Sequence, residues 1–101
     1  MEALIKDVLA FRDERNWKQY HDEKDLAISI VLEASELLEN FQWKSSEKAK
    51  EKDMQNIKEE MADVLIYLIQ LADKLGIDLE KEALLKMAKN REKYPVGDKK
   101  K

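Results

Sequence analysis

The sequence has no cysteine, one proline and only two glycines among its 101 residues. The lack of cysteine excludes disulfides, cysteine-ligated zinc and thiol catalysis, and is compatible with a reducing compartment. The scarcity of glycine and proline leaves few residues for the tight turns on which sheets, sandwiches and barrels depend. Leu, Ala, Glu, Lys and Met dominate instead, and these are good helix formers. The composition therefore predicts an all-α fold.

The sequence also lacks a large net charge and a long hydrophobic run. Its 19 Lys and Arg residues nearly balance its 22 Asp and Glu residues, for a formal net charge of −3. No strong overall field therefore attracts nucleic acid or anionic lipid. No stretch approaches about 18 uninterrupted apolar residues, and residues 1–15 alternate charged and apolar side chains, unlike a signal peptide. We expect a soluble cytoplasmic protein with no nucleic-acid and no membrane partner.

Hydrophobic periodicity predicts four helices. They cover the residues up to Asn16, then 26–38, about 57–75 and 79–94. Asp25 is the expected N-cap of the second helix, Gly76 closes the third and Pro95 stops the fourth after a cap at Asp78. The polar stretch 45–53 is expected to be a loop and the best candidate for a mobile segment. Short connections make consecutive helices antiparallel neighbours in one small core, in which the second and third helices face each other.

The length predicts a single domain, residues 1–96, followed by a basic flexible tail, residues 97–101. A chain this short buries only about 60 to 65% of its unfolded surface, so a large active-site cavity must be lined by few elements or shared with another chain. The second helix, LAISIVLEASELL, is apolar around nearly its whole circumference, which is more than a monomer of this size needs. We therefore predict a homo-oligomer.

Two pairs of carboxylates have a spacing that puts each pair on one helical face: Glu33 with Glu36, and Glu60 with Asp63. These acids interrupt the most apolar parts of the chain, and few cations are near, Lys58 being the closest in sequence. A carboxylate in apolar surroundings must be paired, protonated or bound to a metal. An all-carboxylate shell suits Mg²⁺ or Mn²⁺, which often serve substrate phosphates. The residues alone leave metal-dependent phosphate chemistry and ion pairing about equally open.

The order of these motifs resembles the MazG-like nucleoside triphosphate pyrophosphohydrolases of the all-α NTP pyrophosphatase superfamily, in particular its small single-domain, dCTP pyrophosphatase-like branch. The family signature is ExxE followed by ExxD on successive helices. It corresponds here to Glu33-Ala-Ser-Glu36 and Glu60-Met-Ala-Asp63, with LLENFQW after the first pair and DVLIYL within the second. The segments RNWKQYH and NREKYP extend the match over nearly the whole chain.

The resemblance implies an enzyme that hydrolyses (deoxy)nucleoside triphosphates to the monophosphate and pyrophosphate, as nucleotide-pool house-cleaning. It makes Glu33, Glu36, Glu60 and Asp63 the catalytic residues and the ligands of Mg²⁺, with Mn²⁺ as a substitute. The physical logic agrees, because a metal neutralises phosphate oxygens and orients a water without a covalent intermediate. By family analogy, the predicted homo-oligomer is a tetramer rather than a dimer.

The resemblance also implies a set of substrate-binding residues: Trp17, His21, Trp43, Tyr67, Lys86, Asn90, Arg91 and Tyr94. The two tryptophans flank the second helix and are implied to sandwich the base, with the histidine close to the nucleotide. Tyr67 follows Asp63 by one turn, so its ring is expected beneath the sugar. Lys86, Asn90 and Tyr94 form a polar stripe on the final helix that is implied to approach the phosphates and sugar, and Arg91 is a further candidate for phosphate binding. Core packing or an ordinary exposed face remains an alternative role for each of these residues.

One segment departs from the family pattern. Many relatives have His-x-Pro-Lys-x-Leu before the second helix, whereas this chain has His21-Asp-Glu-Lys-Asp-Leu26, with Glu23 in place of proline. The change affects the approach of His21 and Lys24, and base specificity with them, but not the metal site. Two other functions remain open: a dUTP diphosphatase-like enzyme, and a non-catalytic helical interaction module whose acidic pairs bind cations on a partner.

Overall fold

The computed structural model describes residues 1–97, in which it has five helices and no strand. The helices are α1 (Glu2–Glu14), α2 (Glu23–Glu39), α3 (Ser46–Lys52), α4 (Met54–Lys74) and α5 (Leu79–Lys93). The all-α prediction is confirmed, and the count of four helices is wrong by one. Of the predicted basic tail, all but the first residue lies outside the described range, and the domain limits 1–96 remain a prediction.

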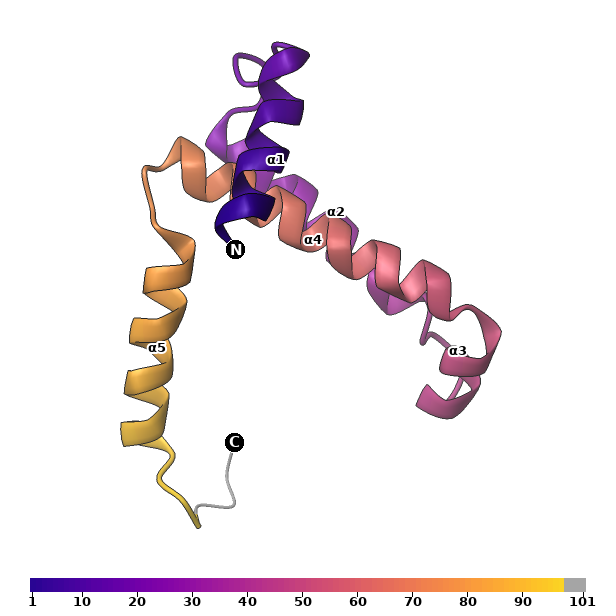
Figure 1. The fold of residues 1–101 in the computed structure, drawn as a ribbon. Helices are drawn as coiled ribbons and strands as arrows, with labels where there is room; N and C mark the ends of the chain where they lie inside the picture. Colours follow the sequence, from indigo (N-terminus) through magenta and orange to yellow (C-terminus); the bar gives the residue numbers. More distant parts are fainter. Residues whose placement is uncertain (98–101) are drawn as a thin grey trace.

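The centre of the fold is the antiparallel pair of α2 and α4, which confirms the predicted contact between the two acidic helices (Figure 1). Leu26 of α2 and Ile69 of α4 are each 2% exposed. Near them α1 crosses the C-terminal part of α4 and contributes the buried Val8. Burial of one such side chain contributes about 1.5 to 3 kcal/mol. Most of the hydrophobic core therefore lies at the end of the α2–α4 pair where α4 finishes, and the buried Ala49 and Ile57 lie near the start of α4.

Helix α2 begins three residues earlier than expected, and its N-cap is Asp22 rather than Asp25. The Asp22 carboxylate accepts a hydrogen bond from the Asp25 backbone N–H at 2.7 Å. Asp22 has the extended backbone that an N-cap requires, with ψ at 172°, whereas Asp25 lies inside the first turn. An acidic residue is favoured there as well, because the helix dipole is positive at this end. The sequence offers two suitable aspartates, and the backbone uses the first.

The stretch 45–53, expected to be a loop, instead contains the short helix α3. Ser45 caps it by accepting from the Lys48 N–H at 3.2 Å, and Ala49, 2% exposed, anchors it against α4. Asp53 then caps α4 by accepting from the Asn56 N–H at 3.0 Å. Two side-chain caps and one small buried residue thus order a segment whose composition is otherwise that of a solvated surface.

The end of α4 and the start of α5 follow the prediction. Gly76 has a φ of 66°, the left-handed conformation that closes the helix without a side-chain clash. The Asp78 carboxylate caps α5 by accepting from the Lys81 N–H at 3.1 Å, and α5 ends two residues before Pro95.

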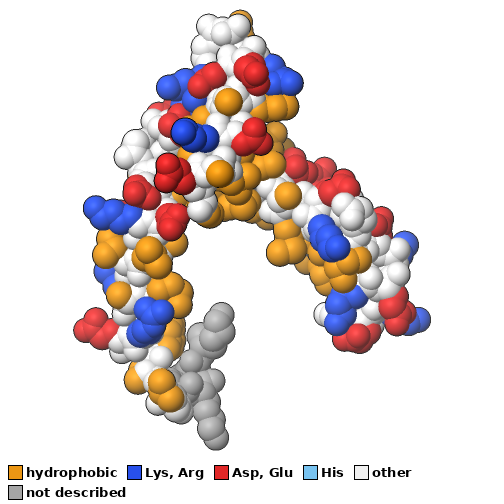
Figure 2. Space-filling view, viewed as in Figure 1, with side chains coloured by type: hydrophobic (Ala, Val, Ile, Leu, Met, Phe, Trp, Pro, Cys, Tyr) orange, Lys and Arg blue, Asp and Glu red, His pale blue; other side chains and the backbone are white. Residues whose placement is uncertain are grey.

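The prediction that all the helices share one small core is wrong for α5, because this helix does not join the core of its own chain. None of its residues is buried, and it runs from the end of α4 away from the α2–α4 pair (Figure 1). Figure 2 shows hydrophobic side chains along the sides of α5 and of the α2–α4 arm that face each other across the open space. The exposed apolar residues include Ile28, Val31, Leu32 and Leu38 of α2 and Leu84, Leu85 and Met87 of α5. One chain therefore leaves two long apolar faces without a covering partner.

Among residues 1–97 no helix combines the length and the apolar character needed to cross a membrane.

Candidate metal centre

The two acidic motifs meet in the middle of the α2–α4 pair. Glu33, Glu36 and Glu60 each place a carboxylate oxygen so that these three atoms all lie within 4.8 Å of one another. Glu33 and Glu36 share one face of α2, and Glu60 comes from the facing turn of α4. Oxygen atoms at this separation can all reach one divalent cation, for which about 2.0 to 2.6 Å is the usual ligand distance. The arrangement could therefore hold a metal ion.

One oxygen of this trio has no partner of its own. Glu60 Oε2 is buried and accepts no hydrogen bond. A buried carboxylate oxygen without a donor is costly and rare in native structures. It is the kind of atom that a cation would satisfy. The donor set, all carboxylate oxygen, also matches the preference of Mg²⁺ and Mn²⁺.

The close approach of like charges changes the protonation of the cluster. The pKa of Glu33 is raised from 4.5 to about 7, first by its hydrogen bond to Glu36, then by burial and by the negative charges of Glu36 and Asp63. The pKa of Glu60 is also raised, chiefly by burial, although the hydrogen bond from Glu33 acts in the opposite direction. Without a cation, Glu33 therefore holds its proton up to near neutral pH.

Asp63, the fourth predicted ligand, is half-buried on α4 one turn beyond Glu60. It is not one of the three groups with converging oxygens. Its charge nevertheless acts on both Glu33 and Glu60, so it lies beside the trio.

Ion pairing within the chain does not account for these acids. The ion pairs formed by residues 1–97 involve none of the four carboxylates. Lys58, the cation nearest in sequence, is exposed and pairs with none of them. A proton, a metal or another cation from outside the chain is thus needed to offset the negative charge of the cluster.

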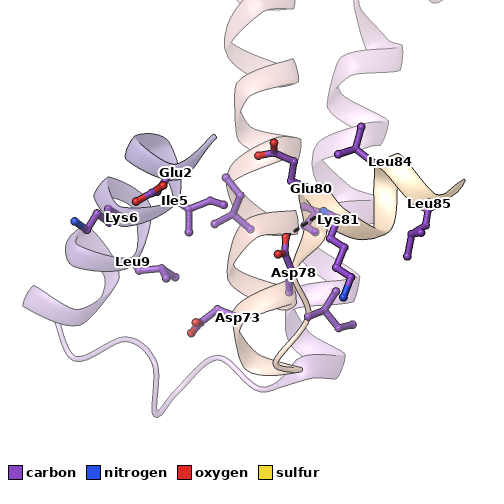
Figure 3. A pocket seen from close by; sticks show the side chains of 14 residues that line it. Glu2, Ile5, Lys6, Leu9, Asp73, Asp78, Glu80, Lys81, Leu84 and Leu85 are labelled. Atoms are coloured by element: carbon purple, nitrogen blue, oxygen red, sulfur yellow. Dashed lines mark hydrogen bonds between the residues drawn. The ribbon is translucent and has the colours of Figure 1, made fainter. Parts of the chain in front are cut away.

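Two cavities of the structure differ in their distance from the carboxylate cluster. One, of about 350 Å³, adjoins the cluster: Glu36 and Glu60 form part of its wall, and the rest comes from the end of α2, the turn after it, α3 and the start of α4. The larger, of about 710 Å³, lies away from the cluster between α1, the end of α4 and the start of α5. Figure 3 shows Ile5 and Leu9 of α1 on one side of it and Leu84 on the other, with charged side chains between them. Two of the three converging carboxylates line the smaller cavity, and none lines the larger one.

Comparisons with known proteins identify the family. The sequence profile of the MazG-like family matches residues 28–101, which include both acidic motifs. The chain belongs to the MazG-like family. A crystal structure of a pyrophosphatase from Archaeoglobus fulgidus is similar to it with a TM-score of 0.86 and 45% sequence identity, covering 94% of this chain and 92% of that chain.

Curated relatives of this MazG-like chain include dCTP pyrophosphatase 1 of Rattus norvegicus, which is 41% identical over 91 residues. The protein of the same name from Homo sapiens is 39% identical over 91 residues. Each alignment covers 85% of this chain and 54% of the relative. The chain therefore spans about half the length of the curated relatives that it matches.

The two tryptophans lie at opposite ends of α2. Trp17 precedes the helix, with its ring 5.6 Å from Phe11 and 5.8 Å from His21. Trp43 follows the helix and is 99% exposed. Since the 17 residues of α2 span about 25 Å, a single chain does not bring the two rings together around one base. His21 is half-buried, and its Nδ1 atom is buried without a hydrogen-bond partner.

The other predicted substrate residues fall into two groups. Tyr67 is half-buried on α4, one turn after Asp63. The polar stripe of α5 consists of Lys86, Asn90 and Arg91, with Tyr94 just after the helix. This stripe belongs to the helix that runs away from the α2–α4 pair (Figure 1), so within one chain it does not reach the carboxylates.

Sequence reasoning missed three polar residues near the cluster. Asn56 of α4 donates a side-chain hydrogen bond to Asn40 at the end of α2, at 2.9 Å. This bond ties the two helices together one turn beyond Glu36. Lys44 lines the cavity that adjoins the cluster. Each asparagine lies near a helix end, where the sequence could have indicated a hydrogen-bonding role. Their pairing with each other depends on the antiparallel register of α2 and α4, which the sequence did not indicate.

Proposed function

We propose that this MazG-like protein is a Mg²⁺-dependent nucleotide pyrophosphohydrolase that converts (deoxy)nucleoside triphosphates to the monophosphate and pyrophosphate. Its role is house-cleaning of the cytoplasmic nucleotide pool. The observation that carries the proposal is the convergence of Glu33, Glu36 and Glu60 from two helices, with an unsatisfied buried oxygen on Glu60. The names of its relatives, dCTP pyrophosphatase and pyrophosphatase, support the same reaction.

The chemistry assigns distinct tasks to the chain. Glu33, Glu36, Glu60 and Asp63 would hold Mg²⁺, or Mn²⁺ in its place, and a bound cation would neutralise phosphate oxygens and make a water more acidic. The helices hold these carboxylates in position before substrate arrives, which lowers the reorganisation needed during reaction. Glu33 would in addition orient the attacking water or accept a proton from it.

The substrate residues proposed above require a second copy of the chain. Tyr67 would pack beside the sugar, whereas Lys86, Asn90 and Arg91 lie on the distant α5 and Tyr94 lies just after it. We propose a homo-oligomer, a tetramer rather than a dimer, in which these α5 residues approach the carboxylates of another chain. In the same way Trp17, with His21, and Trp43 would enclose one base from two chains. The uncovered apolar faces of α2 and α5 are the surfaces such an assembly would bury.

A mixing experiment tests this shared site. Glu60→Gln removes a carboxylate of the cluster, and Asn90→Ala removes a residue of the α5 stripe. If the site is shared, each variant alone is inactive, and mixed subunits regain part of the activity because some sites then contain two intact halves. No recovery after confirmed subunit exchange, or a monomeric mass by light scattering at micromolar concentration, would contradict the shared site.

The activity itself is tested by incubating the protein with separate nucleoside triphosphates and Mg²⁺, and separating the products by chromatography. We expect pyrophosphate and the nucleoside monophosphate in equal amounts, and no reaction in EDTA. Glu60→Gln should be inactive. Glu59→Gln is the matched control, because Glu59 is the exposed neighbour on the same helix and should keep full activity.

The same assay separates the alternatives. Hydrolysis restricted to dUTP would favour the dUTP diphosphatase-like reading. Release of inorganic phosphate in place of pyrophosphate would contradict the proposed reaction. No hydrolysis of any nucleotide by a correctly assembled, Mg²⁺-binding protein would favour the non-catalytic interaction module.

A further inference from the structure

The smaller cavity is polar on nearly every side. Its lining includes two lysines, Lys44 and Lys52, together with the hydrogen-bonded pair Asn40 and Asn56. Ala49 is the only apolar residue of the lining. At about 350 Å³, the cavity is near the lower limit of the roughly 300 to 1,000 Å³ of most ligand pockets. It suits a small, wholly polar group rather than a nucleobase.

Four carboxylates line this cavity together with the two lysines, and three of the four already have a role in the structure. Glu36 and Glu60 belong to the carboxylate cluster. Asp53 caps α4 through the Asn56 N–H, and Glu39 is exposed to solvent. Neither Lys44 nor Lys52 takes part in any ion pair formed by residues 1–97. The cavity is thus lined both by lysines that form no ion pair within residues 1–97 and by two carboxylates of the cluster.

The backbone before Lys44 has an uncommon conformation that separates two side chains. Trp43 has a φ of 62°, in the left-handed region that bulky residues rarely adopt. Its ring is 99% exposed, while the next residue, Lys44, is half-buried and lines the cavity. The chain holds this unfavourable turn at the point where it brings an ammonium group to the cavity wall. Lys52 approaches the same cavity from the end of α3 and is exposed.

We propose that this cavity binds the diphosphate end of the substrate and the released pyrophosphate, with Lys44 as its principal cation and Lys52 as a second one. The inference rests on the proposed function for the identity of the ligand, and on the cavity for its position. A diphosphate carries several negative oxygens, for which an ammonium is a strong hydrogen-bond donor. Glu36 and Glu60 line the same cavity and would hold a cation that neutralises oxygens of this diphosphate.

Calorimetric titration with inorganic pyrophosphate in the presence of Mg²⁺ tests the site without requiring turnover. We expect Lys44→Met, which keeps the aliphatic stem but removes the charge, to weaken pyrophosphate binding about ten-fold or more. Lys44→Arg keeps the charge and should bind within a few-fold of the wild type. Lys48→Met is the matched control, because Lys48 is an exposed lysine of α3 outside the cavity, and its affinity should not change. Binding of a nucleoside monophosphate should be the same in all four proteins.

Each outcome bears on one proposal at a time. Wild-type affinity for pyrophosphate in a folded Lys44→Met variant, or equal losses in Lys44→Met and Lys48→Met, would overturn the diphosphate site and leave the proposed activity intact. No binding of pyrophosphate by the wild type would overturn it too. Lys44-dependent pyrophosphate binding by a protein that hydrolyses no nucleotide would support the site and contradict the proposed function.

Discussion

Two charged clusters occupy different parts of α4, and their difference shows how one helix serves both stability and function. Near the C-terminal end, the buried Arg12 of α1 donates to Asp73 at 2.7 Å and to Asp13 at 2.9 Å. Near the N-terminal end, Glu60 meets Glu33 and Glu36, all of one sign. The first cluster is balanced within the chain, whereas the second is not. Only the second cluster therefore needs a proton or a cation from outside the chain to offset its charge.

The protonation of the two clusters follows from this contrast. Burial alone would lower the pKa of Arg12, but its hydrogen bonds and charge pairing with Asp73 and Asp13 outweigh burial and raise it. At the other cluster, the neighbours have the same charge as Glu33, and the pKa of Glu33 rises to about 7. Pairing with two aspartates favours the charged form of Arg12. The hydrogen bond to Glu36, burial and the nearby negative charges disfavour the charged form of Glu33.

The largest expected effect comes from removing one charge of the carboxylate cluster. Glu36→Gln or Asp63→Asn should lose about 100-fold or more of pyrophosphohydrolase activity, because even outer partners of metal ligands are worth about 10- to 100-fold. The metal-free variant should keep or gain thermal stability, since one repulsion is relieved. Mg²⁺ should raise the melting temperature of the wild type, and that of the variants much less. Melting curves in Mg²⁺ and in EDTA measure this. A much lower melting temperature of either variant than of the wild type in EDTA, with no effect of Mg²⁺ on the wild type, would contradict the metal site.

The balanced cluster should respond in the opposite way. Arg12→Met leaves the Asp73 carboxylate without its cation and should cost about 2 kcal/mol or more, less than the about 3 to 5 kcal/mol of a fully buried pair. The discount reflects the 31% exposure of the Asp73 side chain. Urea unfolding measures the change, and activity per folded molecule should be unchanged. Arg15→Met, at an exposed arginine stacked on Phe11, is the control and should cost clearly less. Equal losses of unfolding free energy in Arg12→Met and Arg15→Met would contradict the special contribution of the buried Arg12 to stability.

The pH dependence of stability gives a finer comparison. In the folded, metal-free chain the pKa of Glu33 is about 7, above its ordinary value of 4.5, so the folded state binds this proton more tightly. The resulting stabilisation is complete below about pH 4.5 and is lost as the pH rises through about 7. In EDTA, the melting temperature of the wild type should therefore fall over this range relative to Glu33→Gln, which lacks the titration. Parallel pH profiles for the two proteins would contradict the raised pKa.

The smallest expected effect tests the start of α2, at the balanced end of the helix pair. Asp22→Ala removes the observed N-cap and should cost about 1 kcal/mol. Asp25→Ala removes only a first-turn charge and should cost a few tenths of a kcal/mol. Chemical unfolding of the two variants compares them directly. A greater loss of unfolding free energy in Asp25→Ala than in Asp22→Ala would indicate that Asp25, the residue expected from the sequence, is the N-cap.

Local patterns predicted most of the helical fold. The spacing of apolar residues indicated α1, α2, α4 and α5, and single residues indicated their ends, as at Gly76 and Pro95. The errors in helix boundaries were also local. The polar composition of residues 45–53 concealed α3, which depends on a buried Ala49 and on capping by Ser45. Such a segment is helical only because α4 is there to pack against.

The sequence by itself determined the chemistry of the candidate centre. Two carboxylate pairs, each on one helical face within an apolar helix, indicated a metal site or an ion-paired cluster, and the periodicity predicted that the two helices face each other. What only the tertiary structure decided was which groups converge and which do not. Glu33, Glu36 and Glu60 meet, Asp63 stands beside them, and Lys44 joins the adjoining cavity, while the α5 stripe lies elsewhere. The physical reason is that helical periodicity fixes the face of a helix on which a residue lies. The register between helices, and the departure of α5 from the core, depend on packing between residues far apart in the chain.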